Sequence, residues 1–170
     1  KNNVLFAVGV TKNELRGSHL EKAIGKIFEN SEAPDVDAAE GKKAMDALSS
    51  AMKDGLVLSC HDCSEGGLAV CLSEMCFSGG VGAVMDCAKV PIEGNLSRAE
   101  ILFSESNSRF IVEVAKPNVK KFIKAMAGVK YTQIGKTVKR QKLIVRNDKE
   151  VIMKEPLSAL KESWQGTLRW

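Results

Sequence analysis

One segment near the middle of the chain joins an apolar run, a glycine pair and an apolar helical pattern without interruption. Residues 56–60 (Leu-Val-Leu-Ser-Cys) have the composition of a buried strand. They run directly into residues 61–67 (His-Asp-Cys-Ser-Glu-Gly-Gly), and the apolar residues of 68–76 then recur on one helical face. Each of these elements must bury its apolar side against another element. The chain therefore has to build a sheet with at least one helix packed on it.

Strand and helix patterns alternate along the rest of the chain. Because they interleave while the last strands cluster, we expect an α+β fold, in which a mixed β-sheet carries helices in a three-layer α/β/α arrangement. No internal repeat or long linker divides residues 1–170, so a single domain is expected. The other predicted strands are 4–10, 81–86, 110–114, 130–138, 142–146 and 151–153, and the helices are 19–29, 36–53, 97–101, about 117–126 and 156–164.

Composition and charge narrow the class of protein. Hydrophobic residues make up 44% and charged residues 27%, values typical of a globular protein, which excludes a disordered chain. The net charge of +4 is too small to indicate nucleic-acid binding. The basic stretch Lys136–Lys142 has no interleaved aromatic residue, so we predict a solvated hairpin between paired strands 130–138 and 142–146.

The sequence indicates a cytoplasmic protein without a membrane partner. It has no run of about 18 apolar residues and no signal-peptide pattern. Its five cysteines, crowded into residues 60–87, are typical of reduced, mostly buried thiols. Because the chain begins at Lys1 rather than at Met, we expect it to be a piece of a longer protein.

The first candidate site is the strand-to-helix junction with His61, Asp62, Gly66 and Gly67. Adjacent glycines allow a backbone or ligand to come close, and free N–H groups at a helix start attract anions. Alternatively, Asp62 or Ser64 caps the helix and satisfies these donors. A zinc site at these residues and the neighbouring cysteines is disfavoured, because no second ligand pair has matching spacing.

Two further polar segments are candidates for ligand binding. Residues 104–109 (Ser-Glu-Ser-Asn-Ser-Arg) place Glu105, Ser106, Asn107 and Arg109 at the entry of a strand, where they could recognise hydroxyls, an amide or a phosphate. The alternative is a turn whose side chains satisfy its own backbone. Gly17-Ser18, at the start of a predicted helix, is a weak phosphate-binding signal, and Ser18 is also a candidate N-cap.

The three segments in this order resemble a known family. The Gly-Ser loop at 17–18, His-Asp-x-Ser-Glu-Gly-Gly-Leu at 61–68 and Leu-Phe-Ser-Glu-Ser-x-Ser-Arg at 102–109 look like the C-terminal domain of aminoimidazole-ribonucleotide-synthetase-like proteins. The last two segments, with the Ser-Glu-Met-Cys-Phe-Ser-Gly-Gly-Val-Gly-Ala sequence between them, most resemble the phosphoribosylformylglycinamidine synthases, glutamine-dependent ligases of purine biosynthesis. The resemblance is strong from Val8 to Phe110 and weaker beyond.

The resemblance implies an ATP-dependent reaction in the full-length enzyme. The amide oxygen of formylglycinamide ribonucleotide is phosphorylated, and ammonia from glutamine displaces the phosphate to give the amidine. ATP and Mg²⁺ are bound mainly by an N-terminal-type domain that is absent here, so this piece is expected to be inactive alone. A glutaminase subunit and a small accessory subunit are the implied partners, and no residue here is assigned a catalytic or metal-binding role.

The resemblance also bears on individual residues. Glu65 stands where the family usually has Asp, and Arg16 where it usually has Gly. The segment 104–109 looks more like the later of two tandem copies, whose site belongs to a pseudo-symmetric partner of the active one. Two alternatives therefore stay open: a non-catalytic structural or pseudo-site domain, and a related synthetase for aminoimidazole ribonucleotide, selenophosphate or hydrogenase maturation.

Overall fold

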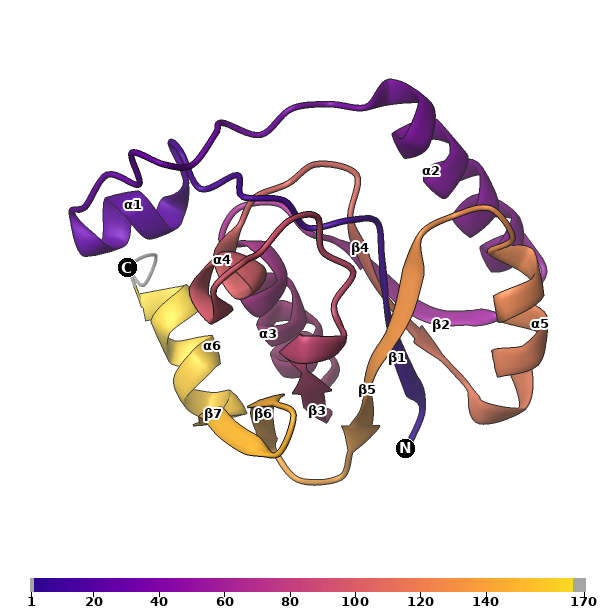
Figure 1. Cartoon of the computed structure of the whole chain (residues 1–170). Coiled ribbons are helices and arrows are strands. Elements are labelled where there is room, and N and C mark those ends of the chain that lie inside the picture. The colour runs from indigo at the N-terminus through magenta and orange to yellow at the C-terminus, as the bar shows by residue number, and fades with distance from the viewer. Residues whose placement is uncertain (1, 167–170) are drawn as a thin grey trace.

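The computed structural model describes residues 2–166, which form a seven-stranded sheet with helices on both faces (Figure 1). The α+β class is confirmed. The strands are β1 (Val4–Val8), β2 (Val57–Asp62), β3 (Gly82–Asp86), β4 (Phe110–Val114), β5 (Tyr131–Val138), β6 (Lys142–Asn147) and β7 (Glu150–Pro156). The helices are α1 (His19–Ile24), α2 (Ala38–Lys53), α3 (Gly67–Gly79), α4 (Arg98–Phe103), α5 (Val119–Ala125) and α6 (Leu157–Gln165), with short 3-10 helices at Cys87–Lys89 and Lys116–Asn118.

The sheet has the strand order β2-β4-β1-β5-β3-β6-β7. All neighbouring strands are antiparallel except β3 and β6, which are parallel, so the expected mixed sheet is present. β6 and β7 form the hairpin predicted around Asn147-Asp148.

The predicted hairpin between β5 and β6 is wrong, because β3 lies between these two strands. The connection 139–141 crosses the beginning of β3 at Gly82, where a Cβ atom would overlap the carbonyl oxygen of Arg140. β3 lies between β5 and β6, and in this position its Ala83 and Met85 side chains are fully buried in the core. The basic residues of 136–142 are exposed, as predicted, but they flank a crossing loop.

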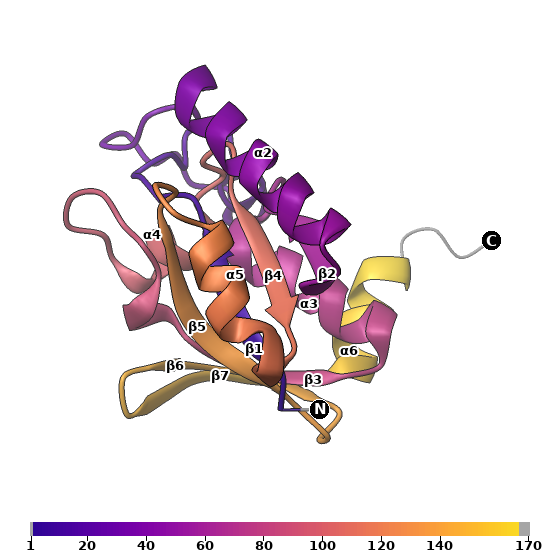
Figure 2. The ribbon, with the colours of Figure 1, turned by 90° about the vertical axis from the view of Figure 1, so that its right-hand side faces the viewer.

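The two faces of the sheet bury separate hydrophobic clusters, which gives the expected three layers. The side chains of β1 alternate between the faces. Leu5 and Ala7 join the cluster under α3, α4 and α6, whereas Phe6 and Val8 join the cluster under α2 and α5. Figures 1 and 2 show α2 and α5 on one side of the strands and α3 and α6 on the other.

Most predicted elements are confirmed to within about two residues, with two differences near the candidate site. α1 ends at Ile24 rather than Glu29, because Gly25 terminates it in the left-handed conformation with φ of 64°. β2 extends through Asp62, so His61 and Asp62 lie at the end of a strand and not in a loop. The α1–α2 connection runs across the top of the molecule in Figure 1.

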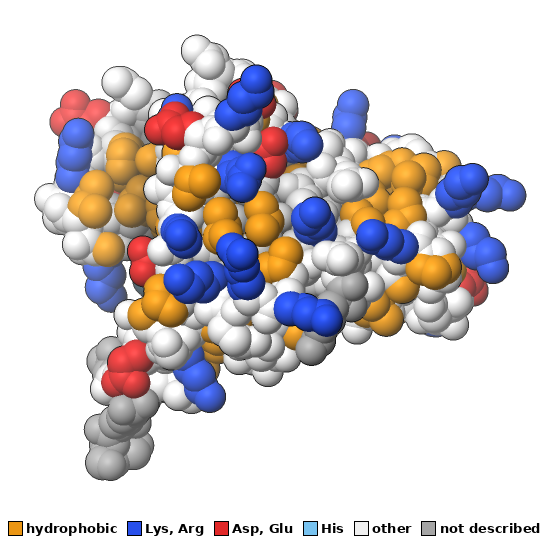
Figure 3. All heavy atoms as spheres, turned by 90° about the horizontal axis from the view of Figure 1, so that it is seen from below, with side chains coloured by type: hydrophobic (Ala, Val, Ile, Leu, Met, Phe, Trp, Pro, Cys, Tyr) orange, Lys and Arg blue, Asp and Glu red, His pale blue; other side chains and the backbone are white. Residues whose placement is uncertain are grey.

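The surface charge is unevenly distributed. Residues 114–147 hold ten of the chain's 25 Lys and Arg residues and none of its 21 Asp and Glu residues. Seen from below, Lys and Arg side chains spread over the molecule with hydrophobic side chains between them (Figure 3). The two aromatic residues of this segment, Phe122 and Tyr131, pack on each other inside the cluster under α2 and α5. Within residues 2–166, no helix is long and apolar enough to cross a membrane.

Candidate functional site

The start of α3 depends on two glycines in the left-handed conformation. Gly66 has φ of 75° and Gly67 has φ of 63°, and no side chain caps the helix at Gly66. A Cβ atom on Gly67 would overlap the carbonyl oxygen of Ser104. The glycine pair therefore lets the helix start lie directly against the segment 104–109, which is a close approach of the kind that we predicted.

The alternative in which Asp62 or Ser64 caps α3 is wrong. The Ser64 hydroxyl donates instead to Asp62 Oδ2 over 3.1 Å. The Gly67 N–H donates to the Ser64 carbonyl, and the Gly66 N–H donates over 2.8 Å to Oε1 of Glu105. The anion at this helix start is thus a carboxylate that lies 39 residues further along the chain, and local capping rules cannot identify it.

Glu105 also joins the third predicted segment to the other two. The same Oε1 atom accepts the N–H of His19 over 2.9 Å, and the His19 ring Nδ1 lies 3.5 Å away from it. Ser18 caps α1, as predicted, by accepting the N–H of Glu21. The start of α1 directly after Gly17-Ser18, the start of α3 and the segment 104–109 therefore meet at one carboxylate, whose side chain is 14% exposed.

Arg109 is buried and forms hydrogen bonds that hold the segment 104–109 in place. It is 2% exposed, and its guanidinium donates to the carbonyl oxygens of Ser104 and Ser106 and to the hydroxyl of Thr11. Burial lowers the pKa of the Arg109 guanidinium from its ordinary value. Each of its three guanidinium nitrogens donates a hydrogen bond within the chain itself.

The two serines of this segment are also occupied. The hydroxyls of Ser104 and Ser106 lie 3.0 Å apart, Ser104 donates to the Lys12 carbonyl, and Ser106 accepts the Lys12 N–H. Of the predicted ligand contacts in 104–109, Asn107 is the exposed one.

A cleft of about 350 Å³ opens beside Asn107, between the segment 104–109 and the beginning of α2. Glu14 lines this cleft and is only 4% exposed. Its Oε1 atom accepts the N–H of Asp35, while Oε2 has no hydrogen-bond partner among residues 2–166. The cleft carries charges of both signs, from Glu14, Asp35, Asp37, Glu40 and Glu93 and from Lys12, Lys43 and Lys130.

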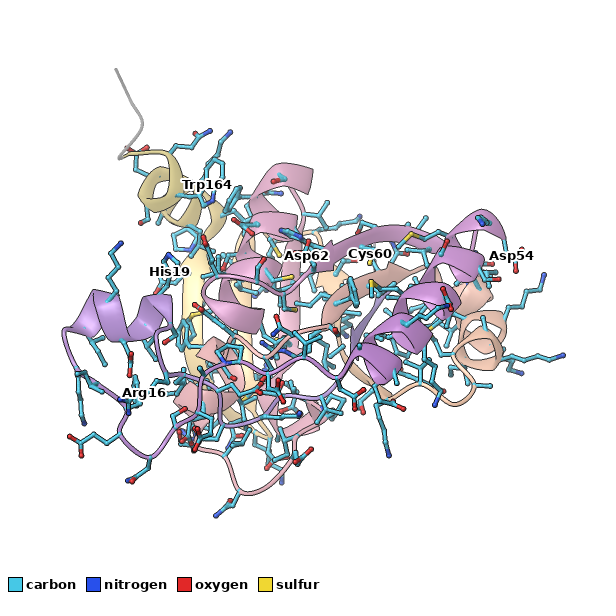
Figure 4. The ribbon with its side chains drawn as sticks, turned by 90° about the horizontal axis from the view of Figure 1, so that it is seen from above. Arg16, His19, Asp54, Cys60, Asp62 and Trp164 are labelled. Carbon is cyan, nitrogen blue, oxygen red and sulfur yellow. The ribbon has the colours of Figure 1, made fainter. Side chains whose placement is uncertain are left out.

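His61 and Asp62 form the other edge of the candidate site, at the end of β2, where Figure 4 labels Asp62. His61 Nδ1 lies 3.2 Å from Asp62 Oδ1, and His61 Nε2 lies 2.9 Å from Glu74 Oε2. Burial alone would raise the pKa of Asp62, but hydrogen bonds from its own N–H, Ser64 and His61 lower it below its ordinary value. Asp62 is therefore an anion at neutral pH.

The described residues do not form a magnesium or zinc site by themselves. Among residues 2–166, no three His, Cys, Asp or Glu side chains are grouped as metal ligands. Glu105 also accepts the Gly66 N–H at the start of α3, a position where a helix start would otherwise attract a phosphate.

Sequence reasoning missed Glu14 and Glu74. Glu74 carried a signal, since it is the single charged residue in the apolar helix α3. A lone charge in such a helix needs a partner, and that partner is His61. Glu14 gave no comparable signal, because it lies in a polar loop.

Comparisons with known proteins agree with this fold and these motifs. Residues 2–148 match the family described as AIR synthase related protein, C-terminal domain, and the chain belongs to this family. The chain is 39% identical over 152 residues to the phosphoribosylformylglycinamidine synthase subunit PurL of Thermococcus sibiricus. This match covers 89% of the chain but 21% of that relative's length.

Solved structures share the fold at lower identity. PurL of Thermotoga maritima in complex with FGAR superposes with a TM-score of 0.82 at 19% identity, covering 94% of this chain and 28% of that one. The HypE–HypF complex gives a TM-score of 0.66 at 16% identity, covering 92% and 52%. The expected family and its C-terminal fold are confirmed.

Proposed function

We propose that this chain is the C-terminal domain of an ATP-dependent synthase that converts formylglycinamide ribonucleotide and glutamine-derived ammonia into the amidine. The observation that carries the proposal is the 39% identity to a PurL subunit over most of the chain. The convergence of the Gly-Ser loop, the start of α3 and the segment 104–109 on Glu105 supports it, because these segments carry the family resemblance.

The proposal divides the work between domains. An N-terminal-type domain of the same enzyme holds ATP and Mg²⁺, as the family resemblance implies. In the cytoplasm, a glutaminase subunit supplies ammonia and a small accessory subunit is a further partner. The solved structure of PurLQS from Thermotoga maritima, which shares the fold, supports partner subunits. In this proposal, the cleft beside Asn107 faces an active site that lies between this domain and the N-terminal-type domain. There, the amide, carboxylate and ammonium groups of the cleft match the hydroxyl, amide and phosphate groups of the substrate.

The test is an assay of the full-length protein that contains this chain. With ATP, Mg²⁺, formylglycinamide ribonucleotide and ammonium chloride, we expect equal amounts of ADP and amidine, the latter identified by mass spectrometry. The 170-residue chain alone should not hydrolyse ATP. ATP hydrolysis by the isolated chain, or a full-length protein that makes no amidine, would overturn the proposal.

A non-catalytic structural role is the second candidate. It is favoured by the side chains of Ser104, Ser106 and Arg109, whose polar groups form hydrogen bonds within the chain itself.

Asn107→Ala distinguishes the catalytic from the structural role, because this residue is exposed and borders the cleft. If the cleft contacts substrate, the variant should raise KM or lower kcat severalfold without changing the melting temperature. The control is Asn95→Ala, at an exposed residue that does not line this cleft. Unchanged kinetics for Asn107→Ala favour the structural role.

A further inference from the structure

Glu74 connects two parts of the molecule that are distant in sequence. Its Oε2 atom lies 2.9 Å from His61 Nε2 at the end of β2. Its Oε1 atom accepts the indole N–H of Trp164, near the end of α6, over 2.8 Å. The Glu74 side chain is 27% exposed, and both of its oxygens are occupied. One carboxylate on α3 thus joins the C-terminal helix to the candidate site.

The hydrogen bonds continue from His61 into the turn before α3. His61 Nδ1 faces Asp62 Oδ1 at 3.2 Å, and Asp62 Oδ2 accepts the hydroxyl of Ser64 at 3.1 Å. Both ring nitrogens of His61 therefore face carboxylate oxygens. An ionised carboxylate accepts hydrogen bonds but cannot donate one. A neutral imidazole can donate from one nitrogen, whereas the imidazolium donates from both. Contacts at both nitrogens fix the orientation of the ring.

α6 is fixed against α3 by more than this hydrogen bond. The ring of Trp164 lies 5.7 Å from that of Phe77, and Leu157 and Leu160 pack on the cluster under α3. Figure 4 labels Trp164 on α6 and Asp62 at the end of β2, and α3 contacts both elements. α6 lies outside residues 2–148, which match the family. A helix outside the region that matches the family therefore packs against α3, the helix that begins at the candidate site.

We propose that Glu74 is a positioning residue that fixes the orientation of the His61 ring, and that Trp164 on α6 holds Glu74 in place. Through His61 this network orients Asp62 and Ser64 beside the start of α3. The network consists of contacts within the chain. Its consequence for ligand binding rests on the proposed function.

The first experiment reads His61 directly. The chain has only two histidines, His19 and His61, so two-dimensional ¹H–¹⁵N imidazole spectra can be assigned with a single His19→Gln variant. Trp164→Phe keeps an aromatic ring beside Phe77 but removes the indole donor, and Glu74→Gln removes the charge. Ser163→Ala, at an exposed residue of the same helix, is the matched control.

We expect both Trp164→Phe and Glu74→Gln to shift the His61 ring nitrogens, while His19 stays unchanged and Ser163→Ala has no effect. If Glu74→Gln fails to fold, Trp164→Phe still decides the question, because its substitution lies on an exposed side chain. His61 signals that are the same in Trp164→Phe and the parent chain would overturn the proposal.

The second experiment uses the full-length enzyme. Trp164→Phe should raise KM for formylglycinamide ribonucleotide or ATP about threefold or more, with a smaller change in kcat and an unchanged KM in Ser163→Ala. Shifted His61 signals with unchanged KM values would overturn the functional consequence and leave the proposed synthase activity intact. A full-length parent protein without synthase activity would instead count against the proposed function.

Discussion

At the scale of single residues, the candidate site is organised by groups that other parts of the chain must accommodate. Gly67 admits the carbonyl of Ser104, and Glu105 supplies the anion that the start of α3 lacks. Each of these two residues contacts a segment that is distant from it in the sequence. Their effects can be separated from general helix stability, because α3 also contains a glycine without such contacts.

Gly67→Ala should destabilise the chain by about 2–4 kcal/mol, because a Cβ atom there combines overlap with Ser104 and a positive φ. Gly79→Ala is the control in the same helix, since nothing lies within 4 Å of its Cβ position. It should be neutral or stabilising by up to about 1 kcal/mol. Urea unfolding of the two variants measures this difference, and equal destabilisation would contradict the close approach.

The thiol of Cys60 should react slowly at neutral pH. Burial raises its pKa to about 11, and the neighbouring Cys63 and Asp62 add to this effect. At pH 7.5 the thiolate is therefore on the order of one in a thousand or less. Alkylation by iodoacetamide, followed by mass spectrometry, should accelerate about tenfold per pH unit up to about pH 10. A rate at pH 7.5 like that of an exposed cysteine would contradict the assigned burial.

The same shift predicts how stability depends on pH. Above about pH 9 an unfolded thiol loses its proton while the folded Cys60 keeps it, so the free energy of unfolding should fall as the pH rises toward 11. A Cys60→Ala variant should show less of this fall.

At the scale of elements, the segment 104–109 is held by one buried cation. Arg109 joins Thr11 to the carbonyls of Ser104 and Ser106, and thereby fixes the peptide that presents Glu105 and Asn107. The exposed Arg98 instead pairs with Glu150 across the surface. The two arginines provide a matched contrast between a buried and an exposed guanidinium.

Arg109→Met should cost about 3 kcal/mol or more, because it leaves buried carbonyls without donors. Arg98→Ala should cost less than about 1 kcal/mol, since its partner is exposed and water replaces the contact. Chemical denaturation of both variants is the measurement. A small effect at Arg109 would mean that the segment is held by other contacts.

The sequence predicted most elements but not how distant ones pair. Apolar runs such as Val4–Val8 and Phe110–Val114 predicted strands correctly, because the local composition of a buried strand is enough to identify it. The insertion of β3 between β5 and β6 depends on pairing at a separation of about 50 residues, and a short connection suggested a hairpin instead. For the same reason, the three motifs could be named from the sequence, while the carboxylate that joins them could not.

At the scale of the whole molecule, β1 connects both hydrophobic clusters. Leu5 and Phe6 are adjacent and fully buried, yet their side chains enter opposite faces of the sheet. We therefore expect the two layers to unfold together, in agreement with the single domain that we predict.

Leu5→Ala and Phe6→Ala should each destabilise the chain by about 3 kcal/mol or more and shift one common transition. Calorimetry tests this directly, since a single cooperative unit gives equal calorimetric and van't Hoff enthalpies. Two resolved transitions, each sensitive to one variant, would show that the faces are independent units.

The central place of β1 has a consequence for how the polypeptide matures during synthesis. Of the seven strands of this sheet, β1 is translated first, yet its neighbours β4 and β5 follow only at residues 110–114 and 131–138. β1 must therefore stay without its sheet partners until about a hundred further residues have been translated. Such late closure exposes the nascent chain to aggregation, so cells should depend on chaperones at this stage.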